Sequence, residues 1–408
     1  MRIFGAVRHS NDPEFFYGGL WSENFYPALR ELGHEIIESQ TDLFPASRFM
    51  AVADNFTHAE INLRTSITEH ILDEVRAAQQ QGPVHLFLSY FYNSHFDPQG
   101  FDELRRLGIP SVNFYCNSIY QFALVSAIAA KVDFSWHAER DARPAYLAIG
   151  ANPIWVQMGA NPEVYHPMPN QRRQPRACFV GQHYADRDRL LAKLVTHSVP
   201  VDIYGSGWKS LLSNDQLQKP ASQETQEYLG RRIPRPGSLA SYSQAISGNI
   251  EREGVLTGIG RSFRQARYRH HTRRIDSLLA PSARGVAGNI SETFSQYEVI
   301  LNFSNVWADG RPAAQLIPHV RLRDFEAPMC RTCYLTGYTD EIAEFYELGR
   351  EIDTYASSDE LVDKAKFYLS HPGEAERLRE AGYRRALRDH TWKRRFQQLF
   401  AALGLQNS

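Results

Sequence analysis

The chain has 408 residues, of which 43% are hydrophobic and 22% are charged, and its formal net charge is -1. This length predicts two domains, and the composition excludes an intrinsically disordered chain. A net charge this close to zero excludes a general attraction to nucleic acid or to anionic membranes, so we expect no nucleic-acid partner.

The N-terminal stretch MRIFGAVRHSNDPEFF lacks the apolar run of a signal peptide. No other run reaches the roughly 18 apolar residues that a membrane-spanning helix requires. Four cysteines are too few for a disulfide framework in a chain of this size. We therefore expect a cytoplasmic protein, and any membrane contact would be made from its surface.

The first part of the chain alternates strand patterns with helix patterns. Residues 1–8 predict a strand, a turn follows at Gly18 and Gly19, and apolar residues at helical spacing run from 21 to 32. Further helices are expected at 65–82 and 101–108, and further strands at 34–39, 84–91, 109–116, 131–137 and 152–159. This alternation predicts a parallel sheet in a Rossmann-like domain over residues 1–165.

A second alternation follows a stretch that is rich in Pro, Asn and Arg, and we take residues 166–176 as the linker. The second Rossmann-like domain is predicted over 177–390, with an insertion at about 210–285 that fits the pattern poorly. A terminal helix within 391–408 is expected to pack back on the first domain. The fold class is therefore α/β, with two doubly wound domains facing across a cleft, and ligands are expected beyond the carboxyl ends of the strands.

The insertion is strongly basic. Between Arg231 and Arg284 there are eleven arginines, against Glu251, Glu253 and Asp276 as acids, and the stretch RSFRQARYRHHTRRIDSLL predicts a helix. One interpretation is a solvated insertion that binds nothing. The other is a docking surface for an anionic partner, such as a lipid-linked or phosphorylated acceptor at a membrane surface. The sequence leaves both open.

Three glycine turns follow predicted strands and precede or end near helices, at Gly19, Gly181 and Gly205. Such a turn exposes backbone N–H groups and a positive helix end, which together favour a phosphate. Arg187, near the second turn, can add a charge-assisted bond. The alternative is that these glycines serve simply as turn residues. No GxGxxG or Walker sequence is present, which argues against a dinucleotide or P-loop site.

The stretch RLRDFEAPMCRTCYLTGYTDE places charged residues directly before a predicted buried strand, TCYLTG. Arg323 and Glu326 would begin a short helix. There the carboxylate can accept ribose hydroxyls and the guanidinium can hold phosphate oxygens. The alternative is a structural ion pair at i,i+3 spacing. After the strand, Thr339 or Asp340 is expected to cap a new helix whose free N–H groups add to the site.

Cys330 and Cys333 form a Cys-x-x-Cys spacing that leads into a strand. A redox Cys-x-x-Cys normally begins a helix after a strand, so we expect packing rather than a redox or metal site here. No DxD-like motif stands in a convincing place, so we expect neither a metal nor another cofactor.

From Tyr297 to Arg395 the chain resembles the C-terminal domain of glycosyltransferases with the GT-B fold. It is most similar to the group named after the spore maturation protein CgeB. Six elements carry the resemblance in that group's order: YEVILNFS, RDFEAPMC, CYLTGYTDEIAEFYELGREI, DELVDKAKFYLSHP, AGYRRAL and DHTWKRRF. FVGQHYADRDRLL and DIYGSGW extend it upstream to about Cys178, and the first 165 residues fit in outline.

The resemblance implies transfer of a sugar from a nucleotide-diphosphate donor to a glycan, lipid-linked or protein acceptor. Glu326 aligns with the glutamate that binds the donor ribose, and Arg323 and Arg187 are implied around the diphosphate. Together with the glycine turns, the predicted donor-binding residues are Gly19, Gly181, Arg187, Gly205, Asn305, Arg323, Glu326, Thr339 and Asp340. A further glutamate of retaining relatives is Pro318 here, which leaves the stereochemical class open.

The domain over residues 1–165 is expected to be the acceptor side, and an inverting mechanism would need a general base from it. The candidates on its expected cleft-side loops are Asp12, Glu23 and His95, and each of them can also be interpreted as a solvated loop residue. Two other functions stay open beside transfer. One is a sugar-nucleotide 2-epimerase on the same scaffold, which needs no acceptor. The other is a non-catalytic protein that binds a nucleotide sugar and docks through the basic insertion.

Overall fold

The chain divides into two compact units, and the computed structural model describes residues 1–7, 19–169, 172–208, 225–234 and 239–405. Unit 1 comprises Met1–Asn161, Leu229–Arg231 and His390–Ser408. Unit 2 comprises Pro162–Tyr228 and Arg232–Asp389, so it begins before the predicted linker at 166–176.

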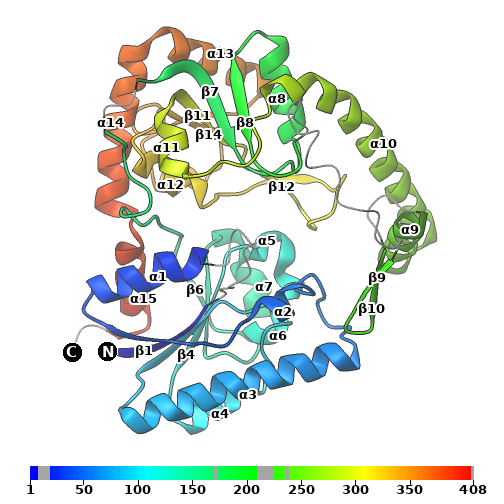
Figure 1. Cartoon of the computed structure of the whole chain (residues 1–408), viewed down its shortest axis with the longest axis vertical. Helices are drawn as coiled ribbons and strands as arrows, with labels where there is room; N and C mark the ends of the chain where they lie inside the picture. Colours follow the sequence, from blue (N-terminus) through cyan, green and yellow to red (C-terminus); the bar gives the residue numbers. More distant parts are fainter. Residues whose placement is uncertain (8–18, 170–171, 209–224, 235–238, 406–408) are drawn as a thin grey trace. The chain divides into compact units, whose positions relative to one another are not determined.

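Unit 1 is built on a six-stranded parallel sheet with the order β2-β1-β3-β4-β5-β6 (Figure 1). Its strands are β1 (Arg2–Ala6), β2 (Glu35–Glu38), β3 (Leu86–Ser89), β4 (Ser111–Tyr115), β5 (Phe134–His137) and β6 (Pro153–Trp155). Every residue of β3 and β4 is buried, because both faces of the sheet are covered. This is why these strands appear in the sequence as continuous apolar runs.

The helices of unit 1 surround an aromatic core. They are α1 (Leu20–Glu31), α2 (Phe44–Ser47), α3 (His58–Gln81), α4 (Gly100–Arg106), α5 (Ser118–Gln121), α6 (Ser126–Ala129), α7 (Arg143–Ala148) and α15 (Trp392–Ala402), with 3-10 turns η1 (Phe122–Leu124) and η2 (Arg140–Ala142). Phe25 of α1 lies 5.5 Å from the ring of Trp136 and 4.9 Å from that of Trp392. The C-terminal helix therefore supplies part of the core of unit 1.

Unit 2 contains a five-stranded parallel sheet with the order β15-β14-β11-β7-β8. Its strands are β7 (Gln174–Val180), β8 (Val201–Tyr204), β11 (Tyr297–Leu301), β14 (Tyr334–Gly337) and β15 (Asp353–Tyr355). β7 begins inside the predicted linker, because Gln174 pairs with Tyr297 of β11. Its polar first residues concealed this start in the sequence.

The remaining elements of unit 2 include the basic insertion. The helices are α8 (Arg187–Thr196), α9 (Leu239–Glu253), α10 (Val255–Leu279), α11 (Ile290–Ser295), α12 (Arg323–Met329), α13 (Ser358–Ser370) and α14 (Pro372–Asp389), with 3-10 turns η4 (Ala280–Ser282) and η5 (Ile342–Glu344). Two hairpins pair β9 (Thr225–Tyr228) with β10 (Arg231–Pro234) and β12 (Asn305–Trp307) with β13 (Leu316–Pro318). The predicted basic helix is α10, which packs against α9 and α8 (Figure 1).

None of the helices in the described ranges combines the length and the apolar composition needed to cross a bilayer.

Candidate functional site

The carboxyl edge of the unit 2 sheet has a point at which the chain reverses its direction of winding. β7 is followed by β8 on one side, whereas β11 lies on the other side of β7 and is followed by β14 and β15. In doubly wound sheets, ligands bind in the crevice at such a point. The loops after β7 and β11, residues 181–186 and 302–304, therefore form the candidate site.

The glycine turns after β7 and β8 contact each other through their backbones. Gly181 N donates to Tyr204 O at 2.9 Å. Gly205 has a φ of +132°, and a Cβ placed on it would lie 2.2 Å from Gly181 O. A side chain at Gly205 is thus excluded by both the backbone conformation and the neighbouring turn. The structure brings these two predicted residues together.

Arg187 is the first residue of α8 and folds back onto its own loop. Its side chain donates from Nη1 to Gln182 O at 2.8 Å and lies over the rings of Phe179 and Tyr184. Only 7% of the residue is exposed. In this structure the guanidinium therefore fixes the shape of the loop after β7.

Asn305 joins the two loops of the reversal point. Its Nδ2 donates to Asp186 Oδ2 at 2.7 Å, and its carbonyl accepts from Arg321 Nη2 at 2.9 Å. Asp186 Oδ1 is buried and has no hydrogen-bond partner among the described residues. The link therefore joins the two loops, and within the described part of the chain it leaves one buried carboxylate oxygen of Asp186 without a partner.

A buried carboxylate that the sequence did not single out holds α12 against the sheet. Asp324 Oδ1 accepts hydrogen bonds from Tyr334 (2.8 Å), Thr336 (2.9 Å) and Asn302 (3.2 Å). Its Oδ2 accepts from Arg321 N at 2.7 Å. Burial raises the pKa of Asp324, although the hydrogen bonds that it accepts oppose the rise. These contacts position the start of α12 beside β11 and β14.

Arg323 and Glu326 form an ion pair within α12. Arg323 Nη1 lies 2.6 Å from Glu326 Oε2, and its guanidinium also lies over the ring of Phe294 at 5.2 Å. The side chain of Arg323 is 21% exposed but that of Glu326 only 4%. Burial and the nearby Glu326 charge raise the pKa of Tyr165. The structure thus contains the i,i+3 pair that the sequence allowed, with Arg323 as its accessible member.

The segment after β14 differs from the sequence-based expectation. Thr339 Oγ1 accepts from Ile342 N at 3.0 Å, as an N-cap does, but the element that follows is the three-residue turn η5. The prediction of a new helix here is wrong, because the chain makes a single 3-10 turn before β15. Asp340 is exposed and accepts from the Tyr338 hydroxyl at 2.9 Å.

The predicted residues of unit 1 lie in different surroundings. Gly19 immediately precedes α1, and the exposed Glu23 donates from its backbone N to Gly19 O at 2.9 Å. His95 is fully buried. Its Nδ1 accepts a backbone N–H at 3.2 Å, and its Nε2 lies 2.9 Å from Ser47 Oγ. A group held in this way cannot contact an acceptor sugar. Asp12 lies outside the described residues.

His137 is a further titratable residue at a strand end, and it was not among the predicted site residues. It ends β5, its Nδ1 lies 2.9 Å from Glu139 O, and its ring stacks on Tyr146 at 5.1 Å. Its buried Nε2 has no hydrogen-bond partner in the part of the chain that the structure describes. Burial lowers the pKa of His137 to about 4, so the imidazole is neutral at pH 7. From its place at the end of FSWH, the sequence favours a satisfied polar residue at a strand end, whereas in the described part of the structure only Nδ1 is within hydrogen-bond distance of a partner.

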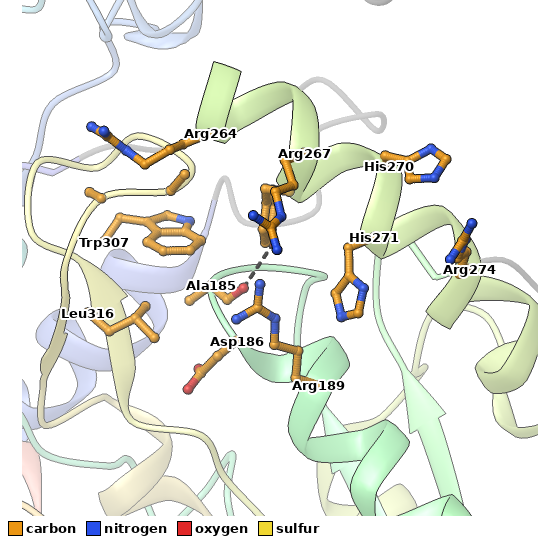
Figure 2. A pocket seen from close by; sticks show the side chains of 13 residues that line it. Ala185, Asp186, Arg189, Arg264, Arg267, His270, His271, Arg274, Trp307 and Leu316 are labelled. Atoms are coloured by element: carbon orange, nitrogen blue, oxygen red, sulfur yellow. Dashed lines mark hydrogen bonds between the residues drawn. The ribbon is translucent and has the colours of Figure 1, made fainter. Parts of the chain in front are cut away.

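A cavity of about 770 Å³ opens beside Asp186, between α8, α10 and the β12–β13 hairpin (Figure 2). The arginine and histidine side chains of the basic helix and of α8 that line it are Arg189, Arg264, Arg267, His270, His271 and Arg274. The helix that the sequence could not assign to a function therefore forms one wall of a cavity at the same edge of the sheet.

The cysteines are buried and free. Burial raises the pKa of Cys330 to about 12 and raises that of Cys333 further, so neither is a thiolate at neutral pH. Within the described ranges, no group of three or more His, Cys, Asp or Glu side chains could hold a metal ion.

Residues 282–401 match a family model described as glycosyl transferase-like. No curated protein matches the chain. A glycosyltransferase structure from Rickettsia africae ESF-5 has a TM-score of 0.56 at 10% identity, covering 100% of this chain and 99% of its own. Sucrose-phosphate synthase from Thermosynechococcus elongatus has a TM-score of 0.54 at 12% identity, covering 98% and 100%. HepE from Anabaena, in complex with UDP and glucose, has a TM-score of 0.52 at 10% identity, covering 99% of each chain.

The chain has the GT-B fold. In this GT-B chain the family match begins at Ser282 and includes the loop after β11, α12 and β14. The residues around the reversal point therefore lie partly within the matched segment, and that segment indicates glycosyl transfer in general.

Proposed function

We propose that this protein transfers a sugar from a nucleoside-diphosphate donor to an acceptor hydroxyl, as a member of the CgeB-like group. The observation that carries the proposal is the reversal point of the unit 2 sheet, the place at which doubly wound folds bind their ligands. There Asn305 and Asp186 join the loops after β7 and β11, and α12 presents a partly exposed arginine. The family match over residues 282–401 supports the same activity class.

The ion pair in α12 suggests how the donor is held. A diphosphate is a better partner for Arg323 than a single carboxylate, because a guanidinium can donate two parallel hydrogen bonds to it. When Arg323 turns toward the diphosphate, Glu326 loses its partner at 2.6 Å. Tyr165 remains hydrogen-bonded to Glu326, but a buried carboxylate that has lost its cationic partner is still costly, so Glu326 then accepts hydroxyls of the ribose. Donor binding is thus an exchange of partners.

This exchange is tested by comparing UDP with 2′-deoxy-UDP in calorimetric titrations. UDP is the probe because the similar HepE structure contains it. We expect wild type to prefer UDP, and Glu326→Ala to weaken UDP binding by about tenfold or more while losing the preference, since a hydrogen bond to a charged group contributes about 1.5–3 kcal/mol. Glu347, which forms another i,i+3 pair with Arg350 at 2.9 Å, provides the matched control Glu347→Ala. A folded Glu326→Ala variant that binds UDP like wild type would refute the role.

Departure of the nucleoside diphosphate requires stabilisation of its growing negative charge. We assign this to Arg323 and to backbone N–H groups of the loop after β7, without a metal. Transfer is then expected to continue in excess EDTA, at a rate within about twofold of the untreated enzyme. Loss of turnover in EDTA that Mg²⁺ or Mn²⁺ restores would overturn the metal-independent mechanism.

Glu23 is the predicted base whose carboxylate is exposed in the described part of unit 1. We expect Glu23→Gln to lower the rate of transfer by about 100-fold or more if it deprotonates the acceptor, with donor affinity unchanged. Asp12 stays a candidate beside it. Release of UDP that depends on an acceptor distinguishes transfer from the 2-epimerase alternative, which would convert the sugar nucleotide without an acceptor.

A further inference from the structure

The basic helix α10 carries two adjacent stripes of side chains with different surroundings. One stripe anchors the helix and comprises Arg261, Gln265, Tyr268 and Thr272. Arg261 lies 2.8 Å from Asp309, the Tyr268 hydroxyl donates to Ala185 O at 2.9 Å, and Thr272 donates to Asp188 at 3.2 Å. These contacts fix α10 against α8, against the loop after β7 and against the loop that follows β12.

The second stripe faces the cavity. It comprises Arg264, Arg267, His271 and Arg274, whose spacing of three or four residues puts them on one face of the helix. Figure 2 shows Arg267 and His271 directed toward Arg189, whereas Arg264 extends above Trp307. Among the described residues, no carboxylate forms an ion pair with Arg189, Arg264, Arg267 or Arg274.

This arrangement differs from that of other arginines nearby. Arg261 and Arg311 both pair with Glu253 and Asp309. The chain therefore neutralises some arginines of the insertion with its own acids and leaves the cavity arginines without them. Four arginines and Asp186 give the cavity a formal charge of +3 before either histidine is protonated. Cations gathered in this way repel one another, and an anionic ligand would relieve that repulsion.

The size and the lining residues of the cavity indicate the class of ligand that it can bind. Its volume of about 770 Å³ lies in the range of small-molecule sites and exceeds what a lone phosphate would fill. Trp307 and Tyr268 form an aromatic wall, with their rings at 5.5 Å in an edge-to-face pair. Aromatic faces pack on sugar C–H surfaces, and guanidinium groups bind phosphates in a bidentate manner. These features fit a phosphorylated sugar or a sugar diphosphate.

We propose that this cavity binds the phosphate-bearing acceptor substrate, separately from the sugar nucleotide. Neither Arg323 nor Glu326 lines the cavity. Asp186 connects the two places, because its Oδ2 binds Asn305 at the reversal point while the residue also lines the cavity. A ligand bound here would thus lie next to the donor crevice. The acceptor role rests on the proposed glycosyl transfer, whereas the binding of a phosphate group does not.

The test uses full-length protein first saturated with UDP and then titrated with inorganic pyrophosphate in a calorimeter. We expect the double variant Arg264→Gln/Arg267→Gln to weaken pyrophosphate binding by about tenfold or more, because it removes two charge-assisted contacts. The control Arg252→Gln/Arg269→Gln removes the same charge. Arg252 is exposed on α9, and Arg269 lies over the Tyr242 ring at 4.9 Å, so neither lines the cavity. We expect binding within about twofold of wild type for this control.

Two results would overturn the proposal. In one, both double variants weaken the binding of pyrophosphate equally, which means that the net charge and not the cavity binds the anion. In the other, UDP and pyrophosphate exclude each other and the cavity variant loses both, which makes the cavity part of the donor site. Pyrophosphate binding that depends on the cavity in a protein that does not bind UDP would support the cavity and refute the proposed function instead.

A second arm distinguishes a lipid-linked acceptor from a soluble one. Phosphatidylcholine vesicles with and without phosphatidic acid are sedimented with wild type and with both double variants. Recruitment by phosphatidic acid that is lost in Arg264→Gln/Arg267→Gln alone supports the lipid-linked phosphate. Binding of glucose 1-phosphate in solution, with the same dependence on the cavity and no recruitment to vesicles, supports the soluble one.

Discussion

The contact between the two glycine turns of unit 2 gives a prediction that can be worked out from the structure. In Gly205→Ala the new Cβ would lie 2.2 Å from Gly181 O and 2.6 Å from Gly181 C. A carbon approaches a carbonyl oxygen to about 3.3 Å at the closest, so one of the turns has to move by about 1 Å. Overpacking of this kind costs about 1–3 kcal/mol, and the positive φ adds about 1–2 kcal/mol. The expected loss is therefore about 2–5 kcal/mol.

A substitution at Gly349 separates the cost of the positive φ from the cost of overpacking, because Gly349 has a φ of +79° and a Cβ there would meet no atom within 4 Å. Gly349→Ala should cost only the backbone share of about 1–2 kcal/mol. Differential scanning calorimetry of the full-length variants measures both losses and resolves the two units if they unfold separately. UDP titration then reports whether the displaced turn after β7 weakens the donor crevice in Gly205→Ala alone. If Gly205→Ala is no less stable than Gly349→Ala, the close backbone contact does not exist.

Three further predictions concern buried groups. Asp324→Ala leaves four hydrogen-bond donors without an acceptor and should lower the free energy of unfolding by about 3–5 kcal/mol. The control Asp340→Ala, at an exposed carboxylate, should change it by less than about 0.5 kcal/mol. Equal melting temperatures of the two variants would contradict the buried network. Burial raises the pKa of Glu60, but its hydrogen bonds to Arg231 and to the Thr57 backbone outweigh this and lower it below 4.5. Because the folded-state pKa is depressed, the Glu60 charge stabilises the fold above about pH 4.5, and this stabilisation is lost as the pH falls through the lowered value. Glu60→Gln should therefore lower the melting temperature at pH 7. A difference in melting temperature that persists undiminished at low pH would argue against the charge. The four buried cysteines should react slowly with Ellman's reagent at pH 8 in the native protein and rapidly after denaturation, and rapid native reaction would show that the thiols are accessible.

The sequence predicts the sheets better than it predicts the site. Buried parallel strands such as β3 and β14 appear as apolar runs bounded by turns, so their positions follow from local pattern. The surroundings of single side chains depend on residues far away in the chain. His95 looks like a loop histidine until Ser47 is placed beside it. The pairing of Arg323 with Glu326 is local, and the sequence allowed it as one of two alternatives without deciding between them.

The basic helix shows what sequence patterns alone do not predict. The sequence spaces its arginines around much of the helix circumference, and composition predicts only that the segment is positively charged. Their division into an anchoring stripe and a cavity stripe depends on Asp309, Ala185 and Asp188, which lie in other segments. Only the fold determines which arginines are neutralised.

The place of α15 in unit 1 has a consequence for synthesis on the ribosome. Trp392 is 1% exposed and packs edge-to-face with Phe25 and Trp136, residues that are made several hundred positions earlier. N-terminal domains generally fold as they emerge, but this one stays incomplete until residues 390–405 have left the exit tunnel. While unit 2 is being translated, unit 1 therefore exposes the aromatic surface that α15 later covers. We expect dependence on chaperones to be greatest during that interval.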